Sequence, residues 1–284
     1  ILNEARSYED LPSEPQAFTP EKEFMMQTLS KKYQSFVSDM KNAAGDSKVH
    51  ATIKGGLHDG SVDDDKISIK KSSVKVSKLR PTQNEIDIDK SLSWPLQKNA
   101  AMLGTFLKGN NVTIMAPIIT LNNKWIIDGH HRWSQVYAFN AQATMACANL
   151  SMPGLNPIEG LKVVQTAIAA TMGTIPQASV KGTNLLKASE DIVKKEVLKL
   201  MSGGSEGPKA LKWLKKFNKI KNNEGPAELA DYVWQQIKVM QSKSQPAPGA
   251  PARGFMPQTD QPPGGMPKLA QLLKKGVVNW NDPF

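Results

Sequence analysis

Apolar residues follow two different spacings along this chain of 284 residues. Over residues 20–42 and again over 157–243 they recur every three or four positions, as in amphipathic helices. Between residues 48 and 150, short strand-like runs alternate with helical stripes. The pattern predicts an N-terminal arm and amphipathic helix over residues 1–47, a sheet-containing domain over 48–150 and a helical region over 151–243.

The domain over residues 48–150 carries the strand signals. A hairpin is expected at 117–127, turned at Asn122 and Asn123, because paired asparagines suit tight turns between strands. A helix should then run from about His130 to Phe139. Further strands are expected at residues 49–53, 67–69, 74–76 and 144–150. These elements predict an α/β (α+β) fold, a small mixed sheet with helices, flanked by helical N- and C-terminal regions.

The helical region should contain four helices, because glycines interrupt its apolar periodicity. They are expected at residues 157–172, 183–202, 208–222 and 226–243. Residues 244–267 are rich in proline and glycine and read as a linker. An apolar and basic tail over residues 268–284 follows, and it could dock on a partner protein.

Charge and cysteine content narrow the possible partners. The formal net charge of +10 and a pI near 9.5 favour an anionic partner such as a nucleotide, a nucleic acid or an acidic protein surface. The single cysteine, Cys147, lies in an apolar context and excludes both an intramolecular disulfide and a cysteine-rich metal cage. No apolar run approaches the roughly 18–20 residues of a membrane span, so we expect no membrane partner.

The strongest chemical signal is the pentapeptide Asp128-Gly129-His130-His131-Arg132, which follows an apolar run and opens a predicted helix. Backbone N–H groups at a helix N-terminus attract anions, and glycine lets a phosphate approach the backbone closely. An arginine can grip phosphate oxygens with its planar fork, and imidazoles can donate further hydrogen bonds. The acid at the end of the strand could hold Mg²⁺. A capped, solvated first turn is the alternative interpretation.

These residues, together with Val76 to Ile86 upstream, resemble the ParB/sulfiredoxin superfamily. The resemblance covers residues 73–150, a little over a quarter of the chain. It implies a nucleotide-binding domain in which Gly129 and Arg132 contact phosphates, with ATP or ADP as the ligand and CTP as a further candidate. Sulfiredoxins carry a cysteine where this chain has His130, which argues against peroxiredoxin repair.

The motif Asp-Gly-His-His-Arg at residues 128–132 is most similar to that of the branch that includes ADP-dependent free serine kinases. That resemblance implies a catalytic base at Glu85. Asp128, which could orient an attacking group, and His130 are further catalytic candidates, and Gln83 could touch the nucleotide. On residue chemistry alone, Glu85 is equally a surface acid that opens a helix, and Gln83 equally a residue that closes the loop.

A second candidate site is the lysine-rich helix expected at residues 208–222. Its lysines cluster on one side of a helical wheel and could contact DNA phosphates: Lys209, Lys212, Lys215, Lys216 and Lys219. A solvated face of a helical bundle explains the same pattern equally well.

The leading hypothesis is therefore a nucleotide-binding protein that performs phosphoryl transfer or nucleotide hydrolysis with Mg²⁺. An alternative is a virion-associated structural or DNA-packaging accessory protein of a phage, in which the same fold serves as a binding module. Residues 1–5 support it, since they resemble the start of head-associated proteins of large contractile-tailed phages, and residues 268–284 would dock on the phage partner. A ParB-like nuclease is the third hypothesis. These alternatives place the protein in the host cytoplasm or in the virion.

Overall fold

The computed structural model describes residues 68–115, 117–151, 156–158, 160–161 and 182–253. Three expected features lie outside these residues: the amphipathic helix at 20–42, the strand at 49–53 and the docking tail at 268–284. Most of the helix expected at 157–172 also lies outside them.

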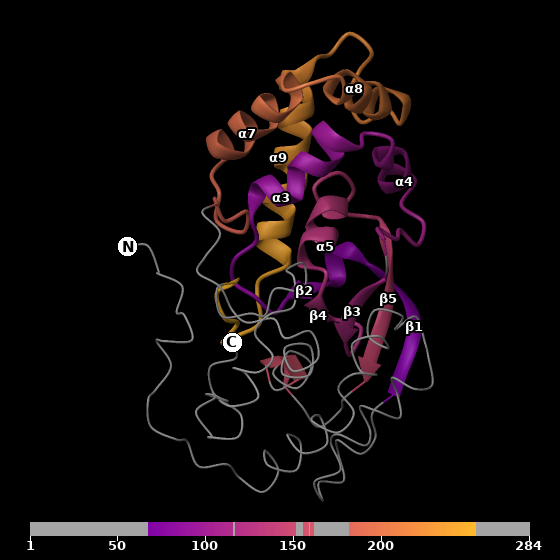
Figure 1. Cartoon of the computed structure of the whole chain (residues 1–284), viewed down its shortest axis with the longest axis vertical. Helices are drawn as coiled ribbons and strands as arrows, with labels where there is room; N and C mark the ends of the chain where they lie inside the picture. Colours follow the sequence, from indigo (N-terminus) through magenta and orange to yellow (C-terminus); the bar gives the residue numbers. More distant parts are fainter. Residues whose placement is uncertain (1–67, 116, 152–155, 159, 162–181, 254–284) are drawn as a thin grey trace, which may run out of the picture.

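A five-stranded mixed sheet forms one layer of the molecule, in the order β1-β5-β3-β4-β2 (Figure 1). The strands are β1 (Ser68–Lys75), β2 (Arg80–Pro81), β3 (Ile118–Leu121), β4 (Trp125–Asp128) and β5 (Thr144–Ser151). β5 runs antiparallel to β1 and parallel to β3, whereas β4 runs antiparallel to β3 and parallel to β2. Together with the helices, this mixed sheet confirms the predicted α/β class.

The β3–β4 hairpin turns at the two asparagines that the sequence singled out. Asn122 and Asn123 both adopt left-handed backbone conformations, with φ of 52° and 53°. The N–H of Lys124 donates to the carbonyl of Leu121 over 3.1 Å and closes the turn. Asparagine tolerates this conformation better than most residues, which is why the pair marks the hairpin.

Four helical segments share one hydrophobic core with the sheet. They are α3 (Ile88–Ser93), a π-helical turn η4 (Trp94–Lys98), α4 (Met102–Lys108) and α5 (His130–Tyr137). Leu96, Leu103 and Phe106 are completely buried. Trp133 of α5 is also fully buried, and its indole N–H donates to the carbonyl of Val76 beyond β1, over 2.9 Å. This bond fixes α5 against the sheet, so the position of its N-terminus is well defined.

The C-terminal helices α7 (Glu190–Ser202), α8 (Glu206–Lys216) and α9 (Pro226–Lys243) stack on these helices (Figure 1). The bounds of α9 agree with the predicted helix at 226–243. α7 begins later than predicted, and α8 ends at Lys216 because Asn218 turns left-handed, with φ of 53°. The prediction that the lysine-rich helix continues to residue 222 was therefore wrong.

Within the part of the chain that the structure describes, no helix combines the length and apolar character that crossing a membrane requires.

Candidate functional site

The turn from Asp128 to Arg132 joins β4 to α5, as the sequence predicted. Gly129 is the N-cap and has φ of 95°, a conformation that residues with a side chain rarely adopt. A Cβ at this position would lie 2.5 Å from Cγ2 of the buried Ile118. The first helical hydrogen bond runs from the N–H of Trp133 to the carbonyl of Gly129. The N–H groups before Trp133 therefore precede the helical ladder, as they do at any helix start.

Arg132 is held beside the turn by two acceptors. Its Nη2 atom forms a 2.7 Å ion pair with Oδ2 of Asp128, and Nη1 donates to the carbonyl of Pro117 over 3.1 Å. The side chains of Arg132 and Asp128 are 21% and 32% exposed, so a solvent-borne anion can reach the guanidinium. The ion pair holds the guanidinium beside Asp128, the first residue of the turn.

Asp128 alone makes a poor magnesium site. Magnesium is usually bound by one or two carboxylates together with substrate phosphates. One oxygen of Asp128 is already paired with Arg132, and the described residues contain no group of three or more histidines, cysteines or acids that could hold a metal ion. Among the residues that the structure describes, the protein groups on their own do not fit a resident magnesium ion.

His130 holds the upstream loop against the turn. The residue is 5% exposed, and the Nε2 atom of its ring accepts a hydrogen bond from the backbone N–H of Thr82 over 3.1 Å. The hydroxyl of Thr82 in turn donates to the carbonyl of Ile126 in β4 over 2.5 Å. Burial lowers the pKa of His130 from 6.5 to about 3, and repulsion from Arg253 and from a protonated His131 adds to the effect. The ring is therefore neutral at pH 7.

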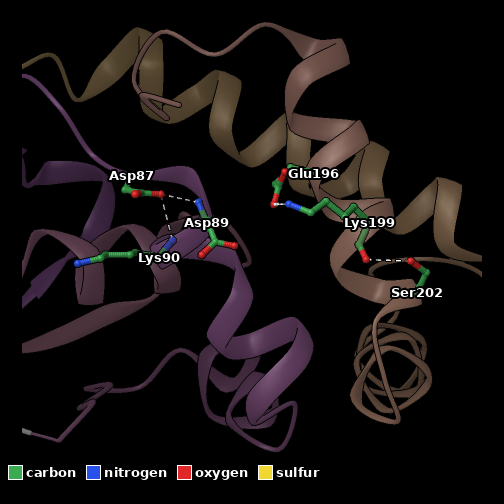
Figure 2. A network of polar contacts seen from close by, with 6 residues as sticks. All are labelled: Asp87, Asp89, Lys90, Glu196, Lys199 and Ser202. Atoms are coloured by element: carbon green, nitrogen blue, oxygen red, sulfur yellow. Dashed lines mark hydrogen bonds and ion pairs between the residues drawn. The ribbon is translucent and has the colours of Figure 1, made fainter. Parts of the chain in front are cut away.

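His131 makes an equivalent bond one residue later. Its Nε2 atom accepts from the backbone N–H of Asp87 over 3.3 Å. The carboxylate of Asp87 caps α3 by accepting from the N–H groups of Asp89 and Lys90 (Figure 2). Burial and the charges of Arg253 and Lys90 lower the pKa of His131 to about 3. Two successive histidines thus pin the two ends of the loop from Thr82 to Asp87.

The structure places Gln83 and Glu85 in this pinned loop. Gln83 is 2% exposed, and its Nε2 atom donates to the carbonyl of Glu85 over 2.7 Å, so its side chain closes the loop. Glu85 accepts a hydrogen bond through Oε2 from the backbone N–H of Arg253, over 3.1 Å. Asn184 supports the loop from behind, because its side chain accepts from the N–H of Ile86 and donates to the carbonyl of Asn84.

Sequence reasoning missed the segment that follows α9. Residues 244–253 begin the stretch that composition marks as a linker, yet they lie along the loop. The N–H of Ala247 donates to the carbonyl of Pro81 over 2.9 Å. Asn84 donates to the carbonyls of Pro251 and Ala250, through its backbone over 2.9 Å and its side chain over 3.0 Å. The segment ends with Arg253, whose Nη1 atom is 3.4 Å from Nδ1 of His131.

No protein-family model, curated protein or solved structure matches the chain.

Only some of the five lysines that the sequence placed on one helical face form an exposed cationic surface on α8. Lys212 is exposed, Lys215 is partly exposed, and Lys216 is exposed with its Nζ atom 4.9 Å from the centre of the Trp213 ring. Lys209 forms a 2.5 Å ion pair with Glu206, which already balances its charge. Lys219 lies beyond the end of α8. Trp213 packs against the core.

Cys147 is buried in β5, and burial raises the pKa of its thiol to about 11. A thiol with this pKa is almost entirely protonated at neutral pH, so it has little nucleophilic character.

Proposed function

We propose that the chain binds a nucleotide through its phosphates, at the turn from Asp128 to Arg132. The observation that supports this most directly is the pairing of that turn with the loop from Thr82 to Asp87. Two backbone N–H groups of the loop donate to the two histidines of the turn. These two bonds hold a second backbone segment against a glycine-containing helix start, an arrangement suited to a phosphate chain.

The charges around the turn favour an anionic ligand. Arg132 lies at the mouth of the turn, and Arg253 and Lys90 are close enough to lower the pKa of His131 electrostatically. Since both histidines are neutral, the positive charge beside the turn comes from Arg132, which is paired with Asp128, and from Arg253 and Lys90. Their charges would be offset by the phosphates of ATP, ADP or CTP.

Magnesium, in this proposal, arrives with the nucleotide. The phosphates would supply most of its ligands, and Asp128 would lie near them without being required to hold the ion alone. Comparing nucleotide titrations with and without MgCl₂ tests this point directly.

Phosphoryl transfer or hydrolysis is the chemistry that this site would support. Catalysis of these reactions depends chiefly on positioning and on stabilising the charge of the transferred group. Arg132 would stabilise that charge. Glu85, a carboxylate in the loop that faces the turn, would accept the proton of the attacking hydroxyl or water.

Calorimetric titration of ATP, ADP and CTP tests the binding proposal. Arg132→Ala removes the guanidinium of the turn and should weaken binding by about 2–4 kcal/mol, because charge-assisted hydrogen bonds to phosphate are lost. Arg80→Ala is the matched control. Arg80 lies in β2, with its guanidinium 5.9 Å from the centre of the Trp125 ring, and its removal changes the net charge equally. The same affinity for Arg132→Ala and the wild type, both folded, would contradict the assignment.

A further inference from the structure

A nitrogen atom of the His131 ring lies close to the guanidinium of Arg253. Nε2 of His131 accepts a hydrogen bond from the N–H of Asp87 and therefore carries no proton. A neutral imidazole accepts at one nitrogen only, so a ring that accepts from Asp87 at Nε2 carries its proton on Nδ1, the atom that is 3.4 Å from Nη1 of Arg253. A guanidinium only donates, so this contact joins two donors. An acceptor placed beside both atoms would receive a hydrogen bond from each.

The backbone around Arg253 fixes the position of this side chain. Its own N–H donates to Glu85, and the carbonyls two and three residues earlier accept from Asn84. Ala247 extends the same contact to Pro81. These bonds join residues 247–253 to the stretch from Pro81 to Glu85. We call the segment over residues 247–253 the strap.

We propose that Arg253 and Nδ1 of His131 together bind a phosphate of the ligand, so that the strap over residues 247–253 is part of the nucleotide site. This inference rests on the proposed function and extends it to a segment remote in sequence from the Asp128–Arg132 turn. The phosphate accepts one hydrogen bond from the imidazole and at least one from the guanidinium. Nearby Lys90 contributes a further positive charge.

The proposal couples the ligand to the end of the chain. A phosphate held by Arg253 adds a contact between the strap and the turn, and that contact exists only when the ligand is bound. Ligand binding should therefore hold residues 247–253 against the loop more firmly, by the ordinary linkage between binding and a conformational equilibrium.

Titration of full-length Arg253→Ala with ATP and with inorganic pyrophosphate tests the contact. We expect affinity to fall about tenfold to a hundredfold, the usual effect of losing a charge-assisted hydrogen bond. Lys243→Ala is the matched control, because it removes the same charge from an exposed residue in the last turn of α9 and should bind within about twofold of the wild type. Unchanged or tighter binding by Arg253→Ala overturns the proposal, and tighter binding would identify Arg253 as a competitor of the ligand.

Limited trypsin digestion of the wild-type protein gives a second measurement that needs no variant. ATP should slow cleavage after Arg253 relative to cleavage after Lys221, an exposed residue between α8 and α9. Equal rates with and without ATP contradict the coupling.

Asn84→Ala removes a side-chain bond to the strap and should weaken ATP binding while Arg253 is still present.

These outcomes separate the two proposals. If Arg132→Ala loses ATP binding and Arg253→Ala keeps it, the phosphate turn is correct and the role of the strap is wrong. If the wild type binds neither the nucleotides nor pyrophosphate, the proposed function itself fails.

Discussion

The backbone N–H of Thr82 donates to Nε2 of His130 over 3.1 Å, across 48 residues of sequence. The same threonine bonds through its hydroxyl to Ile126 in β4. One residue therefore ties the loop both to the strand that precedes the turn and to the first residue of α5. Because the acceptor nitrogen must be unprotonated, the geometry of the site depends on a neutral imidazole.

The two neutral histidines predict a loss of stability in mild acid. Each ring has a pKa of about 3 in the folded protein, against 6.5 for an ordinary histidine. The unfolded chain therefore binds more protons between these pH values, and stability falls as the pH is lowered through this window. From pH 7 to pH 5.5 the free energy of unfolding should fall by about 2 kcal/mol. Urea denaturation at each pH measures it.

Substitution of the histidines provides the control. His131→Gln keeps a polar side chain near Asp87 but does not titrate, so it should remove about half of this pH dependence. The double variant with His130→Gln should remove most of it. The same slope in the double variant as in the wild type would show that other groups dominate this range.

Gly129 should tolerate no larger residue. Its φ of 95° is strained for any other residue, and a Cβ would lie 2.5 Å from a methyl group of Ile118, a buried β-branched side chain. Gly129→Ala should therefore cost about 1–3 kcal/mol in the free energy of unfolding. Gly204→Ala is the control, since a Cβ there meets nothing within 4 Å and should change stability by less than about 0.5 kcal/mol. Equal effects in urea denaturation would contradict the strained turn.

Local signals in the sequence were enough to place the turn. A strand that ends at Asp128, a glycine that must turn and a helix that starts at His130 are neighbours along the chain. The hairpin was predictable for the same reason, because Asn122 and Asn123 suit its left-handed turn without help from distant residues. The α/β class followed from these alternating elements.

The partners of these local elements could not be predicted. The bonds of His130 and His131 go to backbone N–H groups, which have no residue signature in the sequence. The strap over residues 247–253 is also held mainly through backbone groups, so its proline- and glycine-rich composition still reads as a linker. In α8 the lysine spacing continues past Lys216, but the helix ends there because Asn218 turns left-handed.

Glu85→Gln separates binding from catalysis. Glutamine can still accept the N–H of Arg253, so the strap and the affinity for ATP should be retained. If Glu85 is the base, the rate of phosphoryl transfer or hydrolysis should fall by roughly 10²–10⁴, because the amide cannot take a proton. Steady-state assays with ATP, ADP and CTP, with and without MgCl₂, measure the rate. A wild type that binds a nucleotide but shows no turnover would indicate a binding module.

The lysines of α8 give a prediction for DNA. If this surface contacts phosphates, neutralising Lys212, Lys215, Lys216 and Lys219 should reduce the log–log dependence of DNA affinity on salt by roughly three to four units. Lys209→Ala should change it by less than one unit, since Glu206 already balances that lysine at 2.5 Å. Fluorescence anisotropy with a duplex over a range of salt concentrations measures both slopes. ATP affinity should not change in either variant, because these lysines belong to a different part of the fold from the Asp128–Arg132 turn. A wild type with no measurable DNA affinity at about 50 mM salt would instead mark these lysines as a solvated helix face, and the nuclease hypothesis would fall first, because a nuclease must hold a polynucleotide.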